Sequence, residues 1–483
     1  MPMASVTGPA AAPSSRYPAF AAFGADADGS ALRGELRGWC VVAIGSLAIA
    51  GIFAFLLALS RIPGVETVVA WPLGFFHKGL VIHVVFSFVV WFLAVFGALL
   101  AVATHIVAGP APRLAGLGRI AVLGMAAALP LLFVPALLDR GEATLNNYVP
   151  TIIDPIYYGG LLVMALALVL AVTRLLVNLP ARRVREQPIV LAMAASGGVY
   201  LVALVCFAMS YWLLADQAPS HAFNEELFWG GGHLLQFLNT QLLIVAWAFL
   251  AGSVLAPAAS FERPAMMAAF FLAAIALLGP WFYVIYPPFA AEQMLAFTNL
   301  QYALGPAALV MVIAVAARSA RSAVPWREPA FLCLVLSAAL FLVGGAFGLF
   351  VDGTDTRTPA HYHGVIAAVT LAFMGLFYTL FLPVQGRPPV LGRALRSQIL
   401  LFAGGQLLAC IGLFLAGGFG APRKTAGAAQ GLQDIGAVIG MAMNGIGALI
   451  AIIGGIMFIW IAAAALLGAP RAGTGAVVGS LQP

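Results

Sequence analysis

Long apolar runs, separated by short polar joints that contain Pro and Gly, make up most of the chain. A helix needs about 20 mostly apolar residues to cross a bilayer. Runs of that kind lie at approximately 38–60, 79–106, 115–138, 155–177, 189–215, 229–255, 265–287, 297–316, 329–351, 361–384, 396–416 and 442–467. The short alternating runs of soluble strands are not found. The pattern therefore predicts an all-α membrane protein, a bundle of twelve transmembrane helices.

Composition places the chain in lipid rather than in water. Of its 483 residues, 63% are hydrophobic and 8% are charged, whereas soluble domains carry roughly 25% charge. The net charge of +6 does not indicate nucleic-acid binding, because the basic residues lie in short loops between apolar runs. We expect a disordered tail at 1–33, a membrane domain at 38–467 and a second tail at 469–483.

The charged loops also predict an orientation. If the N-terminus lies inside, most of the 23 Lys and Arg fall in inner segments and most of the 17 Asp and Glu fall in outer segments. Because inner loops of membrane proteins are enriched in Lys and Arg, we expect both termini to be cytoplasmic. An even number of helices agrees with this expectation.

Four of the seven histidines are expected to form one layer. His83, His233 and the pair His361 and His363 lie near the outer ends of three predicted helices. A polar group in a membrane helix suggests function, and imidazole is a common haem and metal ligand. His361 and His363 are two residues apart, which is about 200° around a helix. They would therefore face opposite ways and each would bind a different haem. The remaining histidines are expected in loops or at helix ends: His77, His105 and His221.

Four segments in chain order resemble subunit I of the haem-copper oxidases, a family that also includes nitric oxide reductases. The segment TPAHYHGVIAAVTLAFMGLFY (358–378) resembles the tenth-helix signature, and HVVFSFVVWFLAVFGALL, beginning at His83, resembles the second. The resemblance implies that His361 is the axial ligand of a high-spin haem. It implies that His83 and His363 both ligate a low-spin haem, and that the two haems are b-type.

Two further segments extend the resemblance. FWGGGHLLQF (228–237) is similar to the sixth-helix signature, in which the histidine, here His233, binds a non-haem metal. The loop GAPRKTAG (420–427) looks like the family's basic pair, so Arg423 and Lys424 are implied to bind haem propionates. The alternative for these two cations is an ordinary pair of loop charges.

The chain departs from the family pattern around the non-haem metal. The segment that matches the seventh helix, GPWFYVIYPPFAAEQ (279–293), has no histidine, and Phe237 stands where the family has Tyr or Glu. One histidine holds copper or iron weakly. We therefore expect a substrate pocket lined by His233, by Gln236 and Thr240 on the same helix face, and by Tyr283 or Tyr286 opposite. Two alternatives are that these side chains only bond helices together, or that carboxylates come from the rim: Glu225, Glu226 and Glu292.

The resemblance implies a respiratory core subunit, a terminal oxidase or nitric oxide reductase, in a bacterial inner membrane. Electrons would come from a cytochrome c or quinol, with a partner subunit, because the chain has no CxxCH motif for covalent haem. Its four cysteines are expected to be buried thiols. Deep positions in the inner half of the predicted helices carry no Asp, Glu or Lys, so protons are expected to enter from the outer face without pumping. The alternatives are a haem protein that does not reduce its ligand and a transporter.

Overall fold

The structure is a computed structural model that describes residues 30–60, 73–179, 187–255, 257–321, 323–351, 353–425 and 427–470. In that part of the chain, twelve helical spans are long and apolar enough to cross a membrane. Each overlaps one of the twelve predicted runs, which confirms the predicted all-α bundle. The expected tails at 1–33 and 469–483 fall largely outside the described residues, but residues 30–33 already belong to the first helix.

The helices of the bundle are listed here in chain order. They are α2 (Ser30–Ser60), α4 (Leu73–Val84), α5 (Trp91–Ala108), α6 (Ala115–Leu137), α7 (Pro155–Asn178), α8 (Pro188–Leu213), α9 (His221–Val254), α10 (Ala259–Ala276), α11 (Leu278–Ile285), α12 (Ala291–Leu300), α13 (Leu304–Ser319), α14 (Pro329–Gly348), α15 (Arg357–Leu376), α16 (Leu382–Val384), α17 (Arg393–Gly418) and α18 (Ile435–Leu467). Two π-helical segments, η2 (Val85–Val90) and η5 (Phe377–Phe381), join α4 to α5 and α15 to α16. The short 3-10 segments are η4 (Gln301–Ala303) and η6 (Gly427–Gln430).

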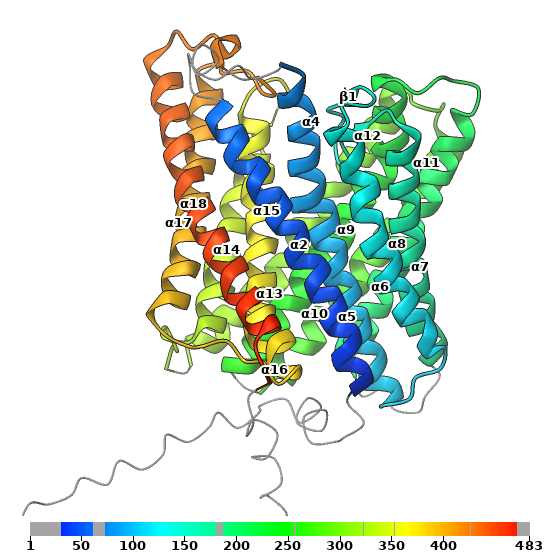
Figure 1. The fold of residues 1–483 in the computed structure, drawn as a ribbon, viewed down its shortest axis with the longest axis vertical. Coiled ribbons are helices and arrows are strands. Elements are labelled where there is room, and N and C mark those ends of the chain that lie inside the picture. The colour runs from blue at the N-terminus through cyan, green and yellow to red at the C-terminus, as the bar shows by residue number, and fades with distance from the viewer. Residues whose placement is uncertain are drawn as a thin grey trace, which may run out of the picture.

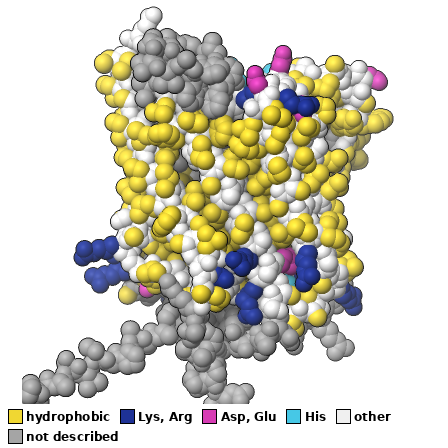
Figure 2. Space-filling view, in the orientation of Figure 1, with side chains coloured by type: hydrophobic (Ala, Val, Ile, Leu, Met, Phe, Trp, Pro, Cys, Tyr) yellow, Lys and Arg dark blue, Asp and Glu magenta, His cyan; other side chains and the backbone are white. Residues whose placement is uncertain are grey.

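The spans stand side by side, and α2 begins at the same end of the bundle at which α18 ends (Figure 1). We call this the terminal end, and the opposite end, which carries β1, the hairpin end. On the face seen in Figure 2, apolar side chains cover the surface between the two ends, and most of the visible Lys and Arg lie near the terminal end. The chain is thus built as an integral membrane protein, and the cytoplasmic position of the terminal end stays a prediction.

A small hairpin connects α6 to α7. Strands β1 (Ala143–Thr144) and β2 (Thr151–Ile152) are antiparallel, with Ala143 opposite Ile152. We call residues 143–152 the hairpin. Asp154 closes its base, because its carboxylate accepts hydrogen bonds of 2.8 Å from Arg140 Nε and from the backbone N–H of Ile156, and so caps α7.

Three spans form the core of the bundle. In Phe76–Ala108, His221–Val254 and Arg357–Val384, 89%, 94% and 83% of the most apolar stretch is buried, against 61% or less elsewhere. Aromatic stacking joins the first to the third, since the rings of Trp91 and Phe377 lie 5.5 Å apart. Trp247 on α9 donates a 2.8 Å hydrogen bond to Ser337, whose hydroxyl donates to Ala368 O on α15. These are the spans that carry His83, His233, His361 and His363.

An ion cluster is buried at the terminal end. Arg174 Nη1 on α7 donates to both carboxylate oxygens of Glu35 at 2.6 Å, and Nη2 donates to His105 Nε2 at 3.2 Å. The three side chains are 6% exposed or less. They approach over Gly118, where any larger residue would contact the Glu35 carboxylate. Glu35 precedes the predicted first run, but α2 starts earlier than expected because this pairing allows the carboxylate to be buried.

Candidate functional site

His83 lies near the end of α4, at the hairpin end of the core. Its Nδ1 is 3.0 Å from the carbonyl oxygen of Ala50 on α2. A carbonyl can only accept, so Nδ1 carries the proton and Nε2 keeps its lone pair. Segment η2 begins two residues later, and single-turn π segments are frequent at functional sites. His83 therefore has the tautomer of a metal-binding imidazole whose second nitrogen is fixed by the backbone.

His361 and His363 lie in the first turns of α15, also at the hairpin end. His361 Nδ1 donates a 2.8 Å hydrogen bond to Gly344 O on α14, so its Nε2 is likewise a lone-pair donor. Gly348 leaves room for the ring, since a Cβ there would lie 2.7 Å from Nδ1. His363 stacks on Tyr362, with ring centroids 5.3 Å apart. The two imidazoles thus differ in their surroundings, and their assignment to two different haems stays a prediction.

His233 is almost fully buried in α9, with 1% of its surface exposed. Its Nδ1 donates to Trp229 O at 2.7 Å, and its Nε2 lies 2.8 Å from the hydroxyl of Tyr148. Because Nδ1 holds the proton of the neutral ring, Tyr148 donates to Nε2. The rings of Tyr148 and His233 are 4.4 Å apart. The nitrogen that would bind a metal is therefore already engaged by a phenol.

Three glycines before His233 let aromatic side chains reach the helix. A Cβ at Gly232 would lie 2.5 Å from Cβ of Tyr148. At Gly231 it would overlap the ring of Phe207, and at Gly230 it would overlap the hydroxyl of Tyr283. Each glycine in a helix interior costs up to about 1 kcal/mol relative to alanine. The run lets three aromatic residues from separate elements pack closely around α9, because residues 230, 231 and 232 point in directions about 100° apart.

Tyr148 is held in a strained conformation by the tip of the hairpin. Its φ of +65° lies in the left-handed region, which costs roughly 1–2 kcal/mol for a residue with a side chain. Glu225 on α9 accepts hydrogen bonds from the backbone N–H and the Nδ2 of Asn147, at 2.9 and 2.5 Å. Burial, and then the charge of Glu225, raise the pKa of Tyr148 well above its usual value. The hydroxyl therefore stays protonated and able to donate.

Gln236, expected to line a substrate pocket, does line a small one together with Tyr148. Asn239 on the same helix also borders this pocket, and Phe88 and Phe92 form part of the opposite wall on the α4–α5 span. Gln236 Nε2 donates to Gly232 O at 3.3 Å, so it also fits the alternative of a helix hydrogen bond. None of the lining side chains is charged. The pocket has room for about one water molecule.

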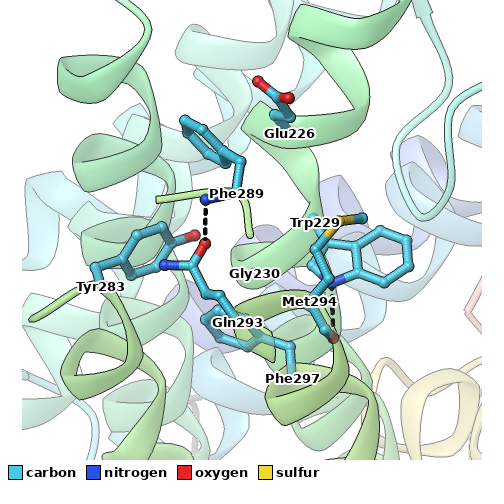
Figure 3. Close-up of a pocket in the computed structure, with 8 residues that line it drawn as sticks. All are labelled: Glu226, Trp229, Gly230, Tyr283, Phe289, Gln293, Met294 and Phe297. Carbon is cyan, nitrogen blue, oxygen red and sulfur yellow. Dashed lines mark hydrogen bonds between the residues drawn. The ribbon is translucent and has the colours of Figure 1, made fainter. Parts of the chain in front are cut away.

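Tyr283, the other predicted site residue, lines a different pocket. This pocket lies between α9, α11 and α12, with Glu226 at its edge (Figure 3). The Tyr283 hydroxyl shares a 2.7 Å hydrogen bond with Ser210. Phe297 separates it from His233, since the Phe297 ring lies 5.5 Å from the ring of Tyr283 and 6.0 Å from that of His233. Tyr283 is therefore a neighbour of the site, and it contacts Phe297 rather than His233.

The basic pair lies in the loop between α17 and α18. Lys424 donates to Leu145 O and so anchors the hairpin from above. Burial, and then the charge of Arg423, lower the pKa of Lys424, whereas Glu225 partly offsets this effect. Their assignment to haem propionates stays a prediction. Of the other expected carboxylates, Glu225 holds the hairpin tip, Glu226 borders the pocket of Tyr283, and Glu292 is exposed on α12.

Histidines outside the layer fall where structural roles were expected. His77 and His221 are exposed, and His105 belongs to the ion cluster with Arg174. The four cysteines are free and buried, as predicted. Sequence reasoning missed Tyr148, because its contact with His233 spans 85 positions. The only local signal was the turn-like Asn146–Asn147 before an aromatic residue.

Two uncharacterised proteins are similar to this chain over most of its length. No protein-family model matches the chain. It is 28% identical to an uncharacterised protein of Aquifex aeolicus over 74% of this chain and 86% of that one. It is 24% identical to an uncharacterised protein of Rickettsia prowazekii over 88% and 94% of the two chains.

Two further similarities concern oxidases. Over 113 residues, 21% of this chain, it is 32% identical to cytochrome c oxidase subunit 1 of Thermus thermophilus, of which 20% is covered. Its structure matches a chain of a haem-copper terminal oxidase dimer with a TM-score of 0.75, over 92% of this chain and 85% of that one, at 15% identity. The chain is therefore an integral membrane protein with the fold of a haem-copper oxidase core subunit. The relatives similar over most of its length carry no assigned activity.

Proposed function

We propose that this chain is the haem-bearing core subunit of a membrane oxidoreductase. One haem is held between His83 and His363, and a second is held by His361. The observation that carries the proposal is that His83 and His361 both donate Nδ1–H to a backbone carbonyl from a neighbouring helix. This arrangement fixes the ring and its tautomer, so that Nε2 is the nitrogen that would bind iron, as second-shell partners of metal-bound histidines do. A polar ring without such a use is costly in a membrane helix.

The two haems differ in the number of histidine ligands, and this difference implies different functions. An iron with two imidazole ligands transfers electrons, whereas an iron with one imidazole keeps a position for a small ligand such as O2 or NO. The chain's own residues hold and orient the rings, which are half-buried in the α4–α5 and α15 spans. Electrons would come from a cytochrome c or a quinol on a partner, at the bacterial inner membrane. Arg423 and Lys424 at the hairpin end would bind the haem propionates.

A second candidate is a haem protein that binds a diatomic ligand without reducing it. The hydrogen bond from Tyr148 to His233 favours it, because that bond engages the nitrogen to which the oxidase resemblance assigns a metal. A second metal would supply charge stabilisation and an electron to the reduction. Consumption of O2 or NO by reduced protein supports the oxidoreductase, whereas reversible binding without consumption supports the second candidate.

Absorption and EPR spectra of the purified protein test the haem ligation. We expect two haems per chain, one low-spin and one that binds CO. His83→Ala should lose the low-spin signal and His361→Ala the CO-binding one. His77→Ala is the matched control, since His77 lies on the same helix as His83 but is exposed, and it should keep both signals. Purified protein without haem, or a low-spin signal that persists in both His83→Ala and His363→Ala, would contradict the proposal.

A further inference from the structure

The residues around His233 do not fit a non-haem metal. Metal sites in proteins use three or four ligands, and the described residues contain no group of three or more His, Cys, Asp or Glu that could hold one. His233 has two nitrogens: Nδ1 donates to Trp229 O, and Nε2 accepts from Tyr148. A metal at Nε2 would have to displace the Tyr148 hydroxyl.

The hairpin is built to keep that hydroxyl in place. Glu225 and Lys424 reach the hairpin from two different elements, α9 and the α17–α18 loop. Asn224 Nδ2 adds a third anchor by donating to Thr144 at 2.9 Å. A bulky residue keeps a strained positive φ only where several surrounding contacts hold its backbone in that conformation. Three anchors beside Tyr148, together with Gly232 beneath its Cβ, satisfy that condition.

We propose that Tyr148 takes the place of the non-haem metal at His233, so that this chain carries a metal-free site. The phenol caps Nε2, and Glu225 and Lys424 act as positioning residues through the hairpin. The small pocket beside the pair, bordered by Gln236 and Asn239, then adjoins a hydrogen-bonded phenol and imidazole instead of a metal ion. This inference does not depend on the haem ligands, because it concerns only the contacts of His233.

Elemental analysis of the purified full-length holoprotein is the first test. We expect iron equal to the haem content, with copper, zinc and additional iron far below one per chain. One non-haem metal per chain that disappears in His233→Ala would overturn the inference. The haem content of the same sample reports separately on the proposed function, so failure of one is distinguishable from failure of the other.

Binding of Zn²⁺ alone, measured by equilibrium dialysis, is the second test. The His233-dependent part is the difference between each protein and its His233→Ala counterpart. In Tyr148→Phe the ion no longer displaces a hydrogen bond, so this part should tighten about 2- to 10-fold. Tyr200→Phe is the matched control, because it removes a buried hydroxyl bonded to Ala165 O elsewhere, and its binding should equal that of wild type. Equal affinity in Tyr148→Phe and wild type would refute the capping role.

Discussion

Replacing Glu35 with Gln removes one charge from the ion cluster at the terminal end. Gln keeps the size of the side chain, so the packing over Gly118 is little changed. What changes is the balance of charge, because the Arg174 guanidinium is 3% exposed and loses its only carboxylate partner in the described chain. His105 supplies no negative charge to Arg174, because its ring only accepts a hydrogen bond from Nη2 while its Nδ1 lies 3.1 Å from Gly109 O.

The size of the effect follows from the geometry. Opposite unit charges 2.6 Å apart attract with about 6 kcal/mol at an effective dielectric constant of about 20. Desolvation of both ions offsets part of this attraction, and removal of one partner from a buried pair typically costs about 3–5 kcal/mol. Arg174 also has a buried Nε without a hydrogen-bond partner in the described structure. We therefore expect Glu35→Gln to lower the free energy of unfolding by about 3–5 kcal/mol.

The assay is SDS-induced unfolding in mixed micelles, followed by the helical circular dichroism signal. Asp139→Asn is the control, because Asp139 pairs with Lys78 but is 89% exposed, and exposed pairs contribute little. Its unfolding curve should match wild type. The double variant Glu35→Leu, Arg174→Met should recover most of the loss, because apolar residues of similar volume can replace a buried ion pair.

Two results would refute this reasoning about the cluster. A loss below about 1 kcal/mol in Glu35→Gln would mean that water or another group compensates Arg174, since that is the cost of an ordinary surface change. A double variant as unstable as Glu35→Gln would mean that the loss arises from packing around the helix ends rather than from an uncompensated charge.

Three further changes test other parts of the fold. Burial tends to raise the pKa of Asp154, but hydrogen bonds from Arg140 and the α7 backbone outweigh it and lower that pKa. The ionised carboxylate therefore stabilises the fold at neutral pH, and this contribution is lost as the pH falls below about 4. Thermal unfolding of Asp154→Asn should lack this loss of stability in acid. Gly232→Ala should push Tyr148 off His233 and reproduce the Zn²⁺ binding of Tyr148→Phe. Gly447→Val should cost about 1–3 kcal/mol in unfolding, because its Cβ meets the α17 backbone, whereas Gly445→Val, with open space, should cost less.

The twelve-helix bundle could be predicted because each span is a local property of the sequence. An apolar run long enough to cross a bilayer leaves its backbone no alternative to a helix. The predicted start of α2 was wrong by about two turns, because a prediction from local hydrophobicity cannot include a distant ion-pair partner. Glu35 and Arg37 look like the start of a polar tail, and only a partner 139 positions away makes burial of Glu35 possible.

The candidate site was predicted unevenly. Gln236 follows His233 by three residues on one helix, so their common face is fixed by helix geometry, and Gln236 does border the pocket beside Tyr148. Tyr283 belongs to another span, and its position relative to His233 depends on how Phe297 packs between them. Asn239 was missed because it lies six residues after His233, about 120° away around the helix, whereas the prediction covered only the face of His233, Gln236 and Thr240.

The glycine run at 230–232 links sequence to site more directly than the histidines do. Glycine weakens a helix, so three in succession within a buried span indicate that something must approach closely. The structure brings Tyr148, Phe207 and Tyr283 to these positions, each from a different segment. The glycines of α9 therefore provide the space that these three side chains occupy, and this space lets Tyr148 approach His233 closely enough for the hydrogen bond. A relative that restores a three-histidine metal site would have no use for a phenol at this position, and we expect its hairpin tip to lack the tyrosine.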